Sequence, residues 1–291
     1  MEPIGWIGIG TLGNAIVNRL LDLNVEVAVF NRTREKVQTL ESRGASVKGS
    51  PREVADCCST TFICLSGETA ARAVLFDKPT GVISARSRGF TVVDVSTMDP
   101  RLAVEIHKTL RKKGIQYIDC PVSGGPEGGA SGRLTAVMSG DKELVEQHRE
   151  IVAKFASTIH YVGGSGLAQV VKLVNNLAES INLLGAAEAI SLGLSAGLSL
   201  EDMRRVLPTM RGHSTYMDVL FERMEHPDEG TSVSLEVRLK DLRLARSLGL
   251  ANRHVSLMGG LIEELFVQII GREGKLADQT KCIKLFLDEQ P

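Results

Sequence analysis

The sequence predicts an α/β fold class in which an N-terminal, doubly wound parallel sheet is followed by an all-α C-terminal domain. Short runs rich in β-branched residues alternate with helical patterns over residues 4–162, which is typical of a parallel sheet. Beyond this region only helical patterns follow. The first, over residues 167–197, would be a long interdomain helix of about 45 Å. We therefore expect domains at 1–163 and 164–291.

The individual elements follow from periodicity and composition. The expected strands are IGWIGI (4–9), VEVAVF (25–30), TTFICL (60–65), FTVVDV (90–95), IQYID (115–119), LTAVMSG (134–140) and TIHYV (158–162). After the long helix, further helices are expected over residues 199–207, 238–249, 255–270 and 277–288.

Composition excludes several classes of protein. With 43% hydrophobic residues in 291, the chain can bury a sizeable core, and its 34 basic and 35 acidic side chains favour no nucleic acid or anionic membrane. The five cysteines show no CxxC spacing, so we expect no disulfide framework and no metal site. The first strand begins by Ile4, and no apolar run approaches the roughly 20 residues that span a bilayer. We expect a cytoplasmic protein that binds a small molecule.

A glycine-rich stretch, DCPVSGGPEGGASGRL over residues 119–134, lies between two expected strands. Glycine and serine clusters are common in flexible linkers. Because β-rich runs flank this one on both sides, we expect a loop held at both ends by one sheet. A loop held in this way can bring its backbone amides close to a ligand.

Gly8, Gly10 and Gly13 form a GxGxxG fingerprint between the first strand and an apolar helix. In this context the motif predicts a Rossmann dinucleotide site, because the helix N-terminus supplies amides and a positive dipole to a pyrophosphate. An ordinary turn between strand and helix is the alternative. We also expect Thr11 and Leu12, inside the fingerprint, to contact the cofactor.

Asn31, Arg32 and Thr33 follow the second expected strand directly. NAD-binding proteins usually carry an acidic residue for the ribose at this position. No carboxylate is present to repel a 2′-phosphate, and Arg32 can grip one bidentately. We therefore expect NADP, with NAD as the weaker cofactor, and place all three residues at its ribose. The alternative is a solvated start of a helix. Leu65, at the end of the 60–65 strand, is assigned to the cofactor as well.

Lys172, Asn176 and Glu179 are spaced four and three residues apart on the long helix, so they share one face. Most helical lysines are solvated charges. Lys172, in contrast, follows an expected dinucleotide domain and the glycines of GGSG. Ligands often bind in clefts between domains, and burial in such a cleft lowers the pKa of a lysine so that it can act as an acid or base.

With these motifs the chain resembles the β-hydroxyacid dehydrogenase family, which includes 3-hydroxyisobutyrate dehydrogenase and glyoxylate or succinic semialdehyde reductases. The resemblance covers nearly the whole chain and rests on five motifs in the family's order. They are GIGTLG, VDVSTMDP, DCPVSGGPEGGASG, GGSGLAQVVKLVNN and LKDLRLA. It implies an oxidoreductase that interconverts a short hydroxy acid and its oxo acid or semialdehyde, and Arg32 makes NADP the expected cofactor.

The resemblance also implies residue roles. Lys172 would be the general acid/base, and Asn176 would orient the substrate. The remaining roles are a substrate carboxylate site at Ser123, Gly124 and Gly125, a nicotinamide contact at Thr97, and a cover over the cofactor made by Lys240 and Asp241.

Two departures from the family pattern stand out. Lys172 stands six positions after Gly166, where the family usually has four, so the start of the helix must be rebuilt. Val233 stands where the family often has Phe, which indicates a wider or less apolar pocket.

Two other functions remain as alternatives. An imine reductase shares the architecture but usually replaces the lysine, and a non-catalytic dehydrogenase-like reader or scaffold would lose the lysine and carry basic extensions. 6-Phosphogluconate dehydrogenase needs a longer helical domain. Because the stretch GGLIEELFVQII over 259–270 is more apolar than a lone surface helix needs, we expect a homodimer or homotetramer.

Overall fold

The computed structural model describes residues 3–227 and 232–287. Its contacts divide the chain into two units, residues 1–172 and 173–291. The division falls inside one long helix, α8 (Leu167–Ser195), whereas the sequence places the boundary in the loop before that helix. We describe the first part as the dinucleotide unit and the second as the helical unit.

A six-stranded sheet forms the centre of the dinucleotide unit, with strand order β3-β2-β1-β4-β5-β6 and all neighbours parallel. Its strands are β1 (Ile4–Ile7), β2 (Val27–Phe30), β3 (Ser46–Val47), β4 (Thr60–Ile63), β5 (Thr91–Asp94) and β6 (Gln116–Asp119). The surrounding helices are α1 (Thr11–Asp22), α2 (Gln38–Ser42), α3 (Pro51–Asp56), α4 (Glu68–Phe76), α5 (Pro100–Arg111) and α7 (Lys142–Val152), with 3₁₀ turns η1 (Arg34–Val37) and η2 (Val82–Ser84). This confirms the predicted doubly wound sheet.

Both faces of this sheet are buried. Because successive side chains of a strand point to opposite faces, each strand contributes residues to both cores. Trp6 and Phe62 lie in the core on one face and Ile7 and Ile63 in the core on the other. The rings of Trp6 and Phe62 stack with centroids 5.2 Å apart, and Phe155 packs edge-on against both. Continuous apolar strands are therefore needed here in place of alternating ones.

A second sheet departs from the expected architecture. Strands β7 (Val122–Ser123), β8 (Leu134–Met138) and β9 (Ala156–Tyr161) form a separate three-stranded sheet. In it β7 is antiparallel to β8, and β8 is parallel to β9. The runs at 134–140 and 158–162 are strands as expected, but they pair away from the parallel sheet. A two-residue strand such as β7 carries too few residues for any periodicity to reveal it.

The glycine-rich stretch is also more regular than a loop held by one sheet. It follows β6 of the large sheet, contains β7, forms helix α6 (Gly125–Ser131) and leads into β8 of the small sheet. A Cβ on Gly129 would lie 3.1 Å from a side-chain carbon of Ile16 on α1. Part of the glycine content therefore allows α6 to pack closely on α1.

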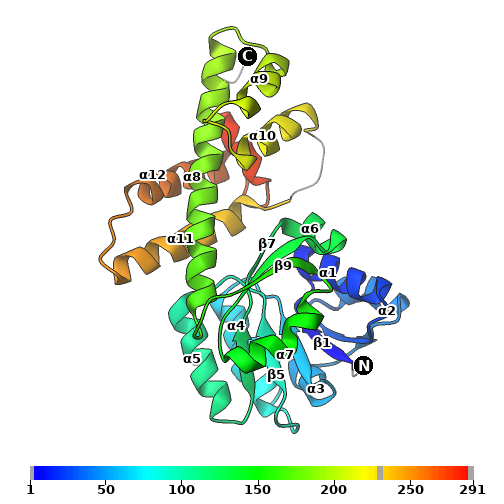
Figure 1. Cartoon of the computed structure of the whole chain (residues 1–291). Coiled ribbons are helices and arrows are strands. Elements are labelled where there is room, and N and C mark those ends of the chain that lie inside the picture. The colour runs from blue at the N-terminus through cyan, green and yellow to red at the C-terminus, as the bar shows by residue number, and fades with distance from the viewer. Residues whose placement is uncertain (1–2, 228–231, 288–291) are drawn as a thin grey trace. The chain divides into compact units, whose positions relative to one another are not determined.

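The helical unit packs around α8, which runs through its middle (Figure 1). Its other elements are α9 (Leu200–Val206), η3 (Leu207–Thr209), α10 (Thr215–Glu225), α11 (Leu235–Ala251), α12 (Leu257–Glu273) and η4 (Gln279–Leu285). Helices α11 and α12 lie side by side (Figure 1). The expected 277–288 helix is the 3₁₀ element η4, and the Asp288 end of that prediction lies outside the described residues.

Helix α8 is, by length and composition alone, able to cross a membrane, contrary to the expectation that no run approaches such a length. The core helix of a soluble protein can be equally long and apolar. Leu183, Ala187 and Ile190 on α8 are buried in the core of the helical unit, whereas Val174 and Leu192 on the same helix are exposed, so core packing accounts for part of its apolar character.

Candidate functional site

The order of the large sheet reverses between β1 and β4, and ligands of such sheets bind beyond the carboxyl ends of the strands at that point. Gly8 follows β1 there, with a φ of +100° that favours glycine. A Cβ at this position would lie 2.2 Å from the carbonyl oxygen of Cys64, which follows β4. The first glycine of the fingerprint is therefore required by the close approach of two strand ends.

The start of α1 is open to a ligand. Gly10 and Thr11 are exposed, Leu12 is half-buried and Gly13 is buried. Gly10 is the N-cap residue of the helix and has no side chain to cap the first turn. The backbone amides of this turn are therefore available to an anion, as the fingerprint predicts.

Asn31 braces the fingerprint loop, a role that sequence reasoning did not assign to it. Its side-chain Oδ1 accepts from the backbone amide of Ile9 at 2.9 Å, and its Nδ2 donates to the carbonyl of Thr33 at 2.9 Å. Arg32 and Thr33 are exposed at the same strand end. Asn31 thus ties the turn after β1 to the residues after β2, and an amide side chain directly after a strand was the available signal.

Leu65 follows β4 and Thr97 follows β5, so both lie at the carboxyl edge of the large sheet. Ser96 organises them, because its hydroxyl oxygen accepts from the backbone amide of Leu65 at 2.8 Å. The backbone amide of Ser96 donates in turn to Asp94 at 2.8 Å. Thr97 follows directly and is half-buried. The carboxyl ends of β1, β2, β4 and β5 therefore carry the predicted cofactor residues of this unit together.

Asp94 is fully buried beneath this edge, where the hydroxyl of Tyr117 donates to its Oδ2 at 3.0 Å. Burial raises the pKa of Asp94 to about 7, against the opposing effect of hydrogen bonds from Ser96 and Tyr117. Burial likewise raises the pKa of Asp119, its partner on β6. The charge of Asp119 adds a smaller contribution that raises the pKa of Asp94 further.

The start of α8 is built by side chains of the sheets. Asp119 accepts from the backbone amide of Gly166, at 3.1 Å to each carboxylate oxygen, and from the hydroxyl of Ser165 at 3.2 Å. Ser139 donates its hydroxyl to Asp119 and accepts from the backbone amide of Ala168 at 3.0 Å. These contacts satisfy the backbone amides of Gly166 and Ala168 at the start of the helix.

A buried glutamine completes this anchor. Gln169 accepts from the backbone amide of Met98 at 3.0 Å and donates to the carbonyl of Ser96 at 2.9 Å. The first turn of α8 is therefore bonded to the segment that holds Thr97. Lys172 lies on α8 three residues after Gln169, where its side chain is half-buried.

The predicted carboxylate-binding residues lie where β7 of the small sheet leads into α6. Ser123 ends β7 and is half-buried, Gly124 is exposed with a φ of +120°, and Gly125 begins α6 with a φ of +65°. Both glycines adopt backbone conformations that other residues rarely take.

The helical unit holds the remaining predicted residues together. Asn176 is only 2% exposed, and its Nδ2 donates to Asp241 at 2.7 Å. Asp241 also pairs with the ammonium of Lys240 at 2.8 Å. One aspartate therefore contacts both the predicted substrate-orienting amide and the predicted cofactor lysine.

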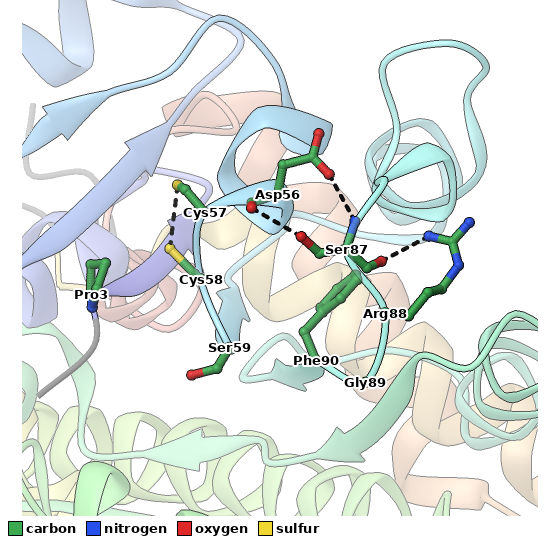
Figure 2. A pocket seen from close by; sticks show the side chains of 9 residues that line it. All are labelled: Pro3, Asp56, Cys57, Cys58, Ser59, Ser87, Arg88, Gly89 and Phe90. Atoms are coloured by element: carbon green, nitrogen blue, oxygen red, sulfur yellow. Dashed lines mark hydrogen bonds between the residues drawn. The ribbon is translucent and has the colours of Figure 1, made fainter.

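A surface hollow of about 370 Å³ lies at the amino ends of β1, β4 and β5, with the thiols of Cys57 and Cys58 3.6 Å apart (Figure 2). Its lining residues are Pro3, Asp56, Cys57, Cys58, Ser59, Ser87, Arg88, Gly89 and Phe90. Because the predicted cofactor residues follow the carboxyl ends of these strands, the hollow is separate from them. Over residues 3–227 and 232–287 no group of three His, Cys, Asp or Glu side chains could hold a metal ion, and the absence of a metal stays a prediction.

Two family descriptions match nearly all of this chain. Residues 3–163 match the NAD binding domain of 6-phosphogluconate dehydrogenase. Residues 166–286 match the NAD-binding region of NADP-dependent 3-hydroxyisobutyrate dehydrogenase.

Individual relatives agree with this match. The chain is 31% identical to 2-(hydroxymethyl)glutarate dehydrogenase of Eubacterium barkeri, over 97% of this chain and 94% of that protein. It is also 31% identical to a probable mitochondrial 3-hydroxyisobutyrate dehydrogenase-like protein of Arabidopsis thaliana, over 95% of this chain and 85% of the relative. A solved structure described as Psf3 in complex with NADP+ and 2-OPP is 37% identical, with a TM-score of 0.91 over 98% of this chain and 100% of that one.

Proposed function

We propose, for a chain that belongs to the β-hydroxyacid dehydrogenase family, an NADP-preferring oxidoreductase that interconverts a short hydroxy acid with its oxo acid or semialdehyde. The observation that carries the proposal is Lys172, half-buried on a helix whose first turn is bonded to the segment holding Thr97. A lysine fixed in this way can serve as an acid/base.

The residues at the sheet edge suit a nicotinamide dinucleotide. Gly10 would leave room for the pyrophosphate at the start of α1, and Gly8 and Gly13 allow the close backbone packing beside it. Arg32 would bind the 2′-phosphate of NADP. The NADP+ held by the 37% identical Psf3 supports the same choice. When bound, the cofactor supplies or accepts a hydride.

The residues of this chain would bind, orient and protonate the substrate. Ser123 with the amides of Gly124 and Gly125 would hold its carboxylate, and Asn176 would donate to one of its oxygens. Lys172 would donate a proton to the oxygen of the carbonyl as it becomes a hydroxyl, and would take that proton back in the oxidation. This exchange keeps negative charge from building up on the oxygen.

Lys172 also separates this proposal from its rivals. Imine reductases usually replace this lysine, and a non-catalytic reader or scaffold of the same fold would not need it. An imine reductase would reduce cyclic imines with NADPH and leave oxo acids untouched, whereas a reader would turn over neither.

A substrate panel tests the proposal. Loss of NADPH would be followed with glyoxylate, succinic semialdehyde, tartronate semialdehyde and methylmalonate semialdehyde, and reduction of NADP⁺ with 3-hydroxyisobutyrate and serine. A cyclic imine serves as the comparison compound. We expect turnover of at least one oxo acid or hydroxy acid. Turnover of the imine alone, or of nothing, would contradict the proposal.

A further inference from the structure

A cluster of polar side chains lies inside the helical unit, where α8, α10, α11 and η4 meet. At its centre is Arg238, which is only 3% exposed. Its guanidinium donates to Gln279 at 2.8 Å, to Glu179 at 2.6 Å and to the hydroxyl of Tyr216 at 2.6 Å. Burial alone would lower the pKa of Arg238, but Tyr216 and Glu179 raise it. A charge buried in this way needs such partners.

Glu179 connects this cluster to the predicted substrate residues. One carboxylate oxygen, Oε2, accepts from Arg238 at 2.6 Å and from the hydroxyl of Tyr216 at 2.9 Å. The other, Oε1, accepts from the side-chain amide of Asn175 at 2.7 Å. The arginine therefore supports an acceptor that is directed at Asn175.

The amides of Asn175 and Asn176 form a chain between two carboxylates. Asn175 Nδ2 donates to Glu179 and, at 3.2 Å, to the side-chain oxygen Oδ1 of Asn176, while Asn176 Nδ2 donates to Asp241 at 2.7 Å. An ionised carboxylate can only accept, so each amide must turn its nitrogen toward its carboxylate. This series of hydrogen bonds thus fixes the orientation of both side-chain amides. It leaves Asn176 one hydrogen on Nδ2 and one lone pair on Oδ1 for a further partner.

We infer that Glu179, held by Arg238, is a positioning residue that acts through Asn175 to fix the amide of Asn176 for the substrate. The inference rests on the proposed function, in which Asn176 donates its remaining hydrogen to a substrate oxygen. Without the Glu179 acceptor, Asn175 can rotate and no longer holds Oδ1 of Asn176, so that Asp241 alone restrains the Asn176 amide. An amide that can rotate presents the wrong atom to the substrate part of the time.

A double substitution separates positioning from packing. Glu179→Gln alone would leave a buried arginine without its counter-charge and would destabilise the helical unit. Glu179→Met combined with Arg238→Met removes both charges at similar volume, so the melting temperature should fall less than in Glu179→Gln, although Gln279 and Tyr216 each lose a hydrogen bond from Arg238. We expect kcat to fall at least about tenfold in this double variant, with the Kd for NADP unchanged. A double variant that keeps both its melting temperature and its kcat would overturn the inference.

Tyr216→Phe is the matched control. It removes a hydrogen bond to Glu179 Oε2 but leaves the bond between Glu179 Oε1 and Asn175 in place. We expect its kcat to stay within about threefold of the wild type. A loss as large as in the double variant would mean that activity follows the general packing of the cluster, and would also overturn the inference.

A second readout does not depend on turnover. In the ¹⁵N-labelled full chain, the side-chain amide hydrogens of Asn175 should exchange slowly with solvent, and should exchange at least about tenfold faster in the double variant. Asn175→Ala and Asn176→Ala identify the resonances. If the wild type turns over no compound of the panel, the proposed function fails while this exchange still decides whether Glu179 orients the amides. Equal exchange in both proteins would contradict the inference.

Discussion

The backbone amide of Gly166 donates to both carboxylate oxygens of Asp119, and this contact connects the large sheet to the start of α8. We predict that Asp119→Ala lowers kcat at least about tenfold, because the first turn of the helix that carries Lys172 loses its acceptor. Loss of a buried acceptor should also cost about 1 to 3 kcal/mol of unfolding free energy. Steady-state kinetics and urea unfolding check both expectations.

Asp141 offers the matched control, since its side chain accepts from the backbone amide of Leu144 at the start of α7. Asp141→Ala should lower the unfolding free energy by about 1 kcal/mol and leave kcat unchanged. Equal losses of kcat in the two variants would show that the contact between Asp119 and Gly166 has no special part in activity.

The cofactor prediction concerns Arg32, which is exposed after β2. Arg32→Asp should weaken binding of NADP at least about tenfold, because it replaces a charge-assisted hydrogen bond worth about 1.5 to 3 kcal/mol with repulsion. Binding of NAD, which has no 2′-phosphate, should change much less. Titration of both cofactors measures the ratio of their dissociation constants, and an unchanged ratio argues against the assignment. Arg34→Asp, two residues further along, is the control for general surface charge.

The buried Asp94 predicts a dependence of stability on pH. Its folded pKa of about 7 lies above the roughly 3.9 of an unfolded aspartate. The folded state therefore binds this proton more tightly, so the carboxyl contributes stability that is full below about pH 4 and is lost as the pH rises toward 7. Asp94→Asn cannot titrate. Its unfolding free energy minus that of the wild type should thus rise between about pH 4 and 7 and level off above. Urea unfolding at several pH values measures the difference, which should stay constant if Asp94 does not titrate in this range.

The exposed apolar face of α12 predicts self-association. Its inner residues, including Ile262 and Phe266, are buried, but Leu257 is 80% exposed, Leu261 56% and Met258 51%. We predict an assembly of at least two chains of 31.4 kDa each, because an apolar helix face of this kind is usually covered. Leu261→Glu should shift the assembly toward monomer. Light scattering that gives the monomer mass for the wild type at micromolar concentration would rule the prediction out.

Much of the fold was predictable because its signals are local. The parallel strands are continuous apolar runs, the fingerprint glycines lie where strand and helix meet, and α8 follows from helical periodicity. The small sheet was harder, since β7 has only two residues and its pairing depends on contacts between distant segments. Helix α6 was also missed, because its glycines favour a loop locally and tertiary packing on α1 overrides that preference.

The candidate site shows the same limit. Glycines and a lysine in a known spacing indicate a cofactor and an acid/base, but the residues that support them come from far along the chain. Asp119 and Gly166 are separated by 47 residues, and Glu179 and Arg238 by 59. Single side chains such as these carry no pattern of their own in the sequence. Their roles become visible only when the fold brings them into contact.

The proposed reaction depends most on Lys172 as the acid/base, and single-turnover oxidation of NADPH by Lys172→Ala tests this role most directly. Removing a positioned acid/base should slow the chemical step by about 10² to 10⁴, while the Kd for NADP stays unchanged because the predicted phosphate contacts lie elsewhere. The wild type and the variant would be compared with the best substrate of the panel, alongside cofactor titration. A rate within about threefold of the wild type, with normal NADP binding, would contradict the assignment of Lys172 as the acid/base.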